Sequence, residues 1–212
     1  PATSQNVVAE ITGREQPDEI VQLGAHLDSW DLGTGAVDDG AGVAIVMTAG
    51  SLIRNLPQRP KRTIRVVLYG AEEVGLVGGK AYAEKHKAEL DRFVIVAEPD
   101  LGQGPVYAFQ TGVADPDEPS LKRIRIALAR LGVVPGDNLS KGSSDVGPLA
   151  RAGVPAATLK LDGTDYFDFH HTPDDTLDKI ESKRINQSAA AYTIFAYLAA
   201  ELSGDYRAKP VR

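Results

Sequence analysis

The sequence predicts an α/β fold, a three-layer sandwich in which helices flank a central mixed, mostly parallel sheet. Short β-rich runs alternate with longer helical runs, so the strands need crossover connections. Such connections imply a largely parallel sheet that is covered on both faces. The 212 residues are 42% hydrophobic and 25% charged, which is typical of a globular protein. Because no repeat or linker divides them, we expect residues 1–212 to form a single domain.

The first half of the chain supplies three strands and one helix. Val7–Thr12 and Glu19–Ala25 are short runs that favour extended structure. Asp39–Leu56 carries apolar residues at helical spacing and is followed by Pro57, which cannot continue a helix. Arg62–Tyr69 is rich in Ile, Val and Leu, which predicts a buried strand.

The middle of the chain continues the alternation. Leu76–Leu90 is predicted as an amphipathic helix, and Arg92–Ala97 as a buried strand. Val106–Gln110 is a weaker strand, and Ser120–Leu131 is predicted as a helix that ends at Gly132.

The last part of the chain is predicted to close the sheet with a strand at Val154–Leu161 and a helix at Arg184–Leu202. Helices of this length between strands indicate right-handed crossovers and parallel pairing. The Pro- and Gly-rich stretch Asp100–Pro119 favours some antiparallel pairing near the middle of the chain.

Composition excludes several classes of function. The chain has no cysteine, so it can form neither thiolate metal sites nor disulfides. Its formal charge of −6 argues against a nucleic acid or an anionic membrane surface as partner. We find no apolar stretch of the length that spans a membrane. The chain starts at Pro1 and its single methionine is Met47, so we expect an N-terminal segment of the full-length protein to be absent from this sequence.

Acidic and histidine residues follow the predicted strands at several separate points. In parallel sheets the carboxyl ends of the strands meet at one edge, where ligands bind. So many carboxylates at one edge would repel each other, and a multivalent cation would remove that repulsion. Imidazole together with carboxylate favours Zn²⁺, with Mn²⁺ or Co²⁺ as substitutes. The residues concerned are His26, Asp28, Asp38, Asp39, Glu72, Glu73, Asp100, His170 and His171.

Five motifs in this order resemble the catalytic domain of the M28 family of co-catalytic dizinc exopeptidases. They are GAHLDSW at Gly24–Trp30, GAVDDGAG at Gly35–Gly42, AEEVGLVGG at Ala71–Gly79, EPDLG at Glu98–Gly102 and HHTPDDT at His170–Thr176. GSSDVGPL at Gly142–Leu149 is most similar to the branch that contains carboxypeptidase Q and bacterial aminopeptidases. The resemblance covers nearly the whole chain.

The resemblance implies two zinc ions held by five side chains. Asp38 would bridge both ions, Glu73 and His171 would complete one site, and His26 and Asp100 would complete the other. The family also implies a cis peptide bond between Asp38 and the residue that follows it.

Further residues take catalytic and binding roles by the same resemblance. Glu72 would be the general base, and Asp28 would orient the imidazole of the first ligand histidine. His170 could stabilise the oxyanion, although some relatives have tyrosine at that position. Ser143 and Ser144 either line the substrate pocket or cap a short helix that begins at residue 146.

The expected function is therefore a zinc-dependent exopeptidase that acts on a peptide or dipeptide. Two alternatives are a single-zinc acyltransferase of the glutaminyl-cyclase type and a non-catalytic receptor-like domain of the same superfamily. Secretion or a periplasmic location, and a homodimer, are expected by resemblance only.

The direction of attack on the substrate stays open at this point. An aminopeptidase needs an acidic group for the free ammonium, whereas a carboxypeptidase needs a basic group for the terminal carboxylate. Asp162, Asp165 and Asp168 are candidates for the first role, and Lys141 and Arg151 for the second.

Overall fold

Seven strands form one mixed sheet in the computed structural model, which describes residues 3–207. The spatial order is β1-β3-β2-β4-β7-β5-β6. The central strands β3, β2, β4 and β7 run parallel, whereas β1 and β5 pair antiparallel with β3 and β7. The strand bounds are β1 Val7–Ile11, β2 Gln16–His26, β3 Arg62–Tyr69, β4 Phe93–Ala97, β5 Val106–Gly112, β6 Val134–Pro135 and β7 Ala156–Leu161.

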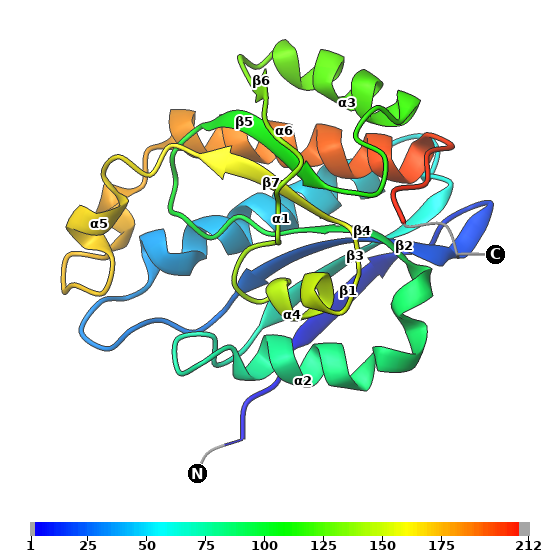
Figure 1. Cartoon of the computed structure of the whole chain (residues 1–212). Coiled ribbons are helices and arrows are strands. Elements are labelled where there is room, and N and C mark those ends of the chain that lie inside the picture. The colour runs from blue at the N-terminus through cyan, green and yellow to red at the C-terminus, as the bar shows by residue number, and fades with distance from the viewer. Residues whose placement is uncertain (1–2, 208–212) are drawn as a thin grey trace.

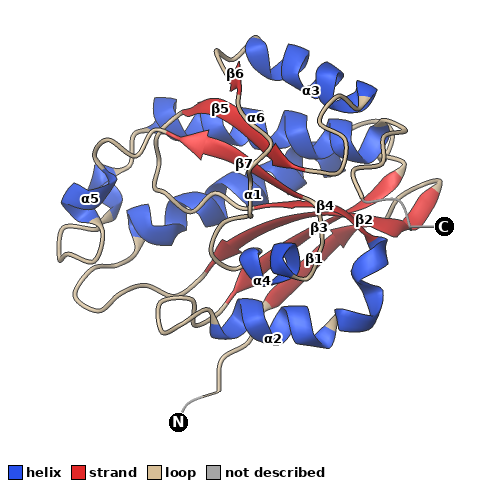
Figure 2. Cartoon of the chain, in the orientation of Figure 1, coloured by secondary structure: helices blue, strands red, loops and turns tan. Residues whose placement is uncertain are grey.

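Helices cover both faces of this sheet and give three layers, which confirms the predicted fold class (Figures 1 and 2). α1, α3 and α6 lie on one face, and α2 and α4 lie on the other. The α-helix bounds are α1 Ala41–Arg54, α2 Val77–Lys85, α3 Pro119–Ala129, α4 Gly147–Arg151, α5 Tyr166–Phe169 and α6 Ser182–Glu201. Shorter helical turns are η1 Ala36–Gly40, η2 Lys87–Arg92 and η3 Leu177–Lys179.

The two faces of each central strand are buried in two separate apolar clusters. Val21 and Leu23 of β2 pack in the larger cluster with Phe195 of α6, whereas Ile20 packs in the smaller one with Tyr82 of α2. Because both faces are covered, the strand sequences are almost continuously apolar instead of alternating. The large continuous core fixes the strands firmly, so the loops at their ends start from rigid positions.

Some local structure differs from the sequence expectation. The helix predicted to reach Leu90 ends at Lys85, and a 3₁₀ segment follows because the chain must turn before Phe93, which is fully buried at the start of β4. Ser143 and Ser144 do not cap α4, whose first turn receives no side-chain hydrogen bond. The serines are held by other contacts near the sheet edge.

The carboxyl ends of the parallel strands lead directly to the predicted site residues. β2 ends at His26. β3 ends at Tyr69, shortly before Glu72, and β4 ends at Ala97, shortly before Asp100. The loop after β7 contains α5 and then His170. The order of strands thus brings side chains from four distant segments to one edge of the sheet.

One segment, Ala36–Arg54, is long and apolar enough to cross a membrane by length and composition, although no such stretch was expected from the sequence. In the structure this segment forms η1 and α1, and half of its most apolar window is buried inside the fold. α1 packs against α6 and the sheet, as expected for a core helix.

Two isoleucines of α3 provide a test of the packing. Ile124 is fully buried in the larger cluster, whereas Ile126 on the same helix is 68% exposed. Ile124→Ala should lower the free energy of unfolding by about 2–5 kcal/mol, because it removes buried apolar surface and leaves a cavity. Ile126→Ala should change it by no more than about 0.5 kcal/mol. Urea denaturation followed by circular dichroism measures both values, and equal effects would contradict this packing.

Candidate metal centre

Asp38 lies at the centre of the cluster, and its two carboxylate oxygens face different histidines. Oδ1 lies 3.2 Å from Nε2 of His26, while Oδ2 lies 3.6 Å from Nε2 of His171 and 3.4 Å from Nε2 of His170. Asp38 is buried, in the short η1 turn that leads into α1. A carboxylate placed in this way can bridge two cations.

His26 is almost completely buried at the end of β2, and its ring has a defined orientation. Its Nδ1 lies 2.9 Å from the carbonyl oxygen of Asp28, which can only accept a hydrogen bond. Nδ1 therefore donates, and Nε2 faces Asp38 and Asp100, whose Oδ1 is 3.7 Å away. Burial lowers the pKa of His26, but the nearby carboxylates of Asp100, Asp38 and Asp39 outweigh this effect and raise the pKa to about 12. The cluster therefore strongly attracts positive charge.

His171 enters the cluster between two aromatic rings. It stacks on Trp30 at 4.5 Å and on His170 at 3.7 Å between ring centroids. Its Nε2 lies 2.8 Å from Oε2 of Glu73. The backbone of His171 is left-handed, with φ of 59°, a conformation that non-glycine residues adopt mainly where the surroundings require it. The ring is thus held against Glu73 and Asp38 by packing on both faces.

Glu73 supplies a test of whether the cluster fits a metal ion. Its Oε1 is buried and has no hydrogen-bond partner within the described chain, although buried polar atoms normally have one. Burial, and then the charge of Asp38, raise the pKa of Glu73. A divalent cation would satisfy this oxygen, and imidazole with carboxylate is a donor set that suits zinc. Three groups of donor atoms meet within 4.8 Å: Asp38, His170 and His171; His26, Asp39 and Asp100; and His26, Asp38 and Glu73.

A pocket of about 380 Å³ opens over the cluster of carboxylates and histidines around Asp38. Burial, followed by the charge of Asp100, raises the pKa of Glu72, a change in the direction that a general base requires. The hydroxyl of Ser144 donates a hydrogen bond to Oδ2 of Asp100. The pocket is lined by Asp38, Glu72, Glu73, Gly75, Leu76, Asp100, Ser144, Tyr166, His170 and His171.

Asp28 holds the loop that carries both glutamates. Its Oδ1 accepts the backbone N–H of Glu72 at 2.9 Å, and its Oδ2 accepts that of Glu73 at 3.1 Å. The expected contact with His26 is therefore made by the backbone carbonyl of Asp28, because the carboxylate, 3.8 Å from Nδ1, faces the loop after β3. The structure thus places the main chain of Asp28, and not its carboxylate, on the imidazole of His26.

Asp175 fastens the bridging residue in the same way. Its two oxygens accept the backbone N–H groups of Val37 at 2.6 Å and Asp38 at 3.1 Å. Sequence reasoning gave Asp175 no role, although it lies inside the HHTPDDT motif. Hydrogen bonds to a charged group are about twice as strong as neutral ones, so this contact is a firm link between the loop after α5 and η1.

Two further carboxylates without an assigned role lie beneath the cluster. Asp39 is joined to Asp38 by a cis peptide bond, as the family resemblance implied, and accepts the backbone N–H of His26 at 3.2 Å. Glu98 accepts the backbone N–H groups of Asp145 at 2.9 Å and Val146 at 3.1 Å. Both lie in the quoted motifs, and only the structure shows that they hold backbone.

The predicted site residues come together at one edge of the sheet, except that Ser143 lies farther from the metal cluster than the others. Of the two serines, only Ser144 lines the pocket of the metal cluster, and Ser143 lines an adjoining pocket. Tyr166, which sequence reasoning did not select, also lines this pocket, and its ring lies 4.9 Å from that of His170. Tyr166 belongs to α5, a single turn too short to give a periodic signal.

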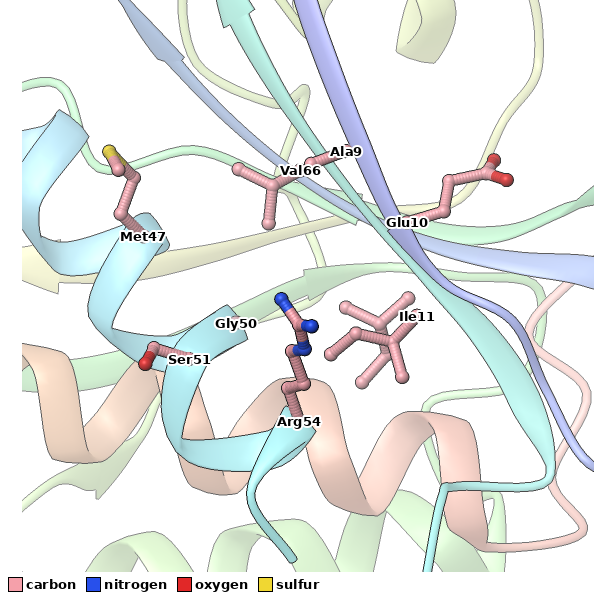
Figure 3. A pocket seen from close by; sticks show the side chains of 9 residues that line it. Ala9, Glu10, Ile11, Met47, Gly50, Ser51, Arg54 and Val66 are labelled. Carbon is pink, nitrogen blue, oxygen red and sulfur yellow. The ribbon is translucent and has the colours of Figure 1, made fainter.

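A hollow away from this edge has a different character (Figure 3). It measures about 290 Å³ and lies between α1 and the edge of the sheet at β1 and β3. Apolar side chains such as Ile11, Met47 and Val66 form most of its wall, with Arg54 and Glu10 as its charged residues. It offers no group of metal-binding side chains among residues 3–207.

Fold and site together define an α/β protein with a candidate metal centre of histidines and carboxylates at the carboxyl edge of its sheet, the arrangement of a metal-dependent hydrolase. The chain belongs to peptidase family M28, whose family model matches residues 6–196.

Individual relatives agree with this family. The chain is 41% identical over 199 residues to carboxypeptidase Q of Rattus norvegicus, a match that covers 94% of this chain and 42% of that protein. A solved structure of a peptidase M28 precursor from Shewanella amazonensis is 51% identical, with a TM-score of 0.91, over 98% of this chain and 47% of that one. A zinc aminopeptidase from Bacillus subtilis shares the fold, with a TM-score of 0.74 at 23% identity over 96% of this chain and 52% of that one. The chain thus spans about half the length of these relatives.

Asp175 offers a test of how the bridging carboxylate is held. In Asp175→Asn an amide N–H₂ would face backbone N–H groups that now bond to carboxylate oxygens. We expect the affinity for zinc to fall by about 10- to 100-fold. Asp174→Asn, an exposed neighbour, is the matched control and should bind zinc like the unmodified protein. Titration against a chelating dye gives both constants; equal affinities would mean that Asp175 does not support the centre.

Proposed function

We propose that this protein is a zinc-dependent exopeptidase that hydrolyses terminal peptide bonds or dipeptides. The observation that carries the proposal is the placement of Asp38, whose oxygens face His26 on one side and His171 on the other. Membership of peptidase family M28 supports the reaction class. Residues 1–212 act as one catalytic domain in this proposal.

Five side chains would hold two zinc ions. His26 and Asp100 would bind one ion, Glu73 and His171 would bind the other, and Asp38 would contact both. The buried, unpartnered Oε1 of Glu73 and the raised pKa of His26 support this set, because both report a site that lacks positive charge. When bound, the ions supply Lewis acidity that activates water and polarises a peptide carbonyl.

Glu72 accepts and returns the proton in this mechanism. Glu72 lines the pocket beside Glu73. The backbone N–H groups of both glutamates donate hydrogen bonds to Asp28, which fixes the loop that carries them. The raised pKa of Glu72 makes its carboxylate a stronger base than an exposed glutamate. It takes a proton from the attacking water and passes it to the leaving nitrogen, which restores the carboxylate.

His170 and Tyr166 are the groups that can donate to the developing oxyanion. Both line the pocket, and their rings lie 4.9 Å apart. We assign this donor role to His170, which lines the pocket next to Asp38. Ser144 positions Asp100 through its hydrogen bond, and Ser143 contacts substrate from the adjoining pocket.

The substrate partner is a peptide or dipeptide, as in the carboxypeptidases and aminopeptidases of this family. The description of the Shewanella relative as a precursor supports export of the full-length protein. We also propose that the protein forms a homodimer. Mn²⁺ or Co²⁺ can replace zinc in this proposal.

Replacement of the base separates catalysis from metal binding. Glu72→Gln should lower kcat for a dipeptide by at least about 10²- to 10⁴-fold, because the amide cannot accept the proton. Its zinc content should match that of the unmodified protein, since Glu72 is not a proposed ligand. Glu84→Gln, on the exposed side of α2, is the control and should keep full activity. A Glu72→Gln enzyme that retains its turnover would exclude Glu72 as the base.

The number of ions is tested by elemental analysis of the purified, zinc-loaded protein. We expect two zinc ions per chain, and about one in Glu73→Gln, because the amide is a much weaker ligand than the carboxylate. A chelator should abolish hydrolysis, and added zinc should restore it. One ion per unmodified chain would favour the single-zinc acyltransferase instead, which cyclisation of an N-terminal glutamine peptide would then reveal.

A further inference from the structure

A second pocket adjoins the metal cluster and shares a wall with it. It has a volume of about 330 Å³, and Asp100 lines both pockets. Ser143 lines the second pocket, while its neighbour Ser144 lines the first. The far wall comes from β7 and includes Thr158 and Lys160. A peptide bound over the cluster could therefore place an adjacent group in this second pocket.

Lys160 is the only lysine or arginine among the described residues that line either pocket. The ionisable residues of the cluster pocket are carboxylates, histidines and a tyrosine. Within residues 3–207, the Lys160 ammonium forms no ion pair or hydrogen bond with a protein group. An ammonium group that forms no ion pair with the protein can bind an anionic group of the substrate in this pocket.

The strand position of Lys160 explains why it reaches this pocket. Leu159 and Leu161 of β7 point into the larger apolar cluster, so Thr158 and Lys160 lie on the opposite face. Thr158 is held by a hydrogen bond with the hydroxyl of Ser140 at 2.7 Å. Lys160 is half-buried, so its ammonium keeps contact with the pocket and with solvent. It is therefore accessible to a group from outside the chain.

Three of the five charged residues considered from the sequence are engaged elsewhere. Asp165 forms an ion pair with Arg184, and Asp162 accepts hydrogen bonds from Thr164. Arg151 lines a different hollow on the outer side of α2 and α4. The site therefore offers a free cation to the substrate beside its acidic cluster.

We propose that Lys160 binds a carboxylate of the substrate in the pocket next to Asp100, either the terminal carboxylate or an acidic side chain. This inference rests on the proposed exopeptidase function and narrows it to peptides that carry a negative charge close to the bond cleaved. A charge-assisted hydrogen bond of this kind corresponds to a preference of about 10- to 100-fold in kcat/KM.

Two pairs of peptides distinguish the sources of the carboxylate. Ala-Leu and Ala-Leu amide differ only in the terminal charge, and Glu-Leu amide and Gln-Leu amide differ only in the side-chain charge. kcat and KM are measured for each with the zinc-loaded protein, Lys160→Met, Lys160→Arg and Lys183→Met. Lys183 is an exposed lysine near the start of α6 and serves as the matched control. Zinc content and circular dichroism verify that each variant is folded and loaded.

The unmodified protein and Lys183→Met should prefer the charged member of one pair by about 10- to 100-fold, and that pair identifies the source. Lys160→Met should lose most of this preference, chiefly through a higher KM for the charged peptide, and Lys160→Arg should retain it. Hydrolysis without preference in either pair, or a preference that survives in Lys160→Met, overturns the inference and leaves the exopeptidase function standing. Hydrolysis of none of the four peptides by the unmodified protein overturns both.

Discussion

The concentration of negative charge at one edge of the sheet is the constraint on which the rest of this structure depends. Asp38, Asp100, Glu72 and Glu73 meet there beside histidines, and no lysine or arginine is among the described residues that line the pocket. Such an arrangement is unfavourable unless positive charge is bound. The raised pKa values of His26 and Glu73 are direct consequences of this crowding. A divalent metal centre, as proposed above, would balance this charge.

The backbone around the cluster is organised by further carboxylates. Asp28 and Asp175 each accept two consecutive backbone N–H groups, in the loop after β3 and in η1. Glu98 does the same at the start of α4. Each contact joins segments that are far apart in the chain, so the ligand loops are fixed to one another as well as to the sheet. The acidic residues of this region thus form two sets. One set lines the pocket, and the other accepts hydrogen bonds from the main chain.

Much of the fold could be predicted because its signals are local. The strand Arg62–Tyr69 was predicted with its observed bounds, since its apolar residues are buried on both faces. The helix predicted to reach Leu90 and the undetected α5 were harder, because a single turn or a 3₁₀ segment has no periodic pattern. Among site residues, the ordered motifs pointed to the groups that now surround Asp38. Tyr166 and Lys160 could not be found in this way, because neither lies in one of those motifs.

Residue types and local patterns were enough to predict the alternation of strands and helices and an acidic edge with histidines. The contacts between atoms came only from the folded chain: the carbonyl of Asp28 on His26, and the two oxygens of Asp38 on different histidines. The fold also places Lys160 and Asp100 in the wall of one pocket. These two residues are far apart along the chain. Residue types and periodicity act locally, whereas a site is assembled by strand order and by loop conformations that depend on packing between remote segments.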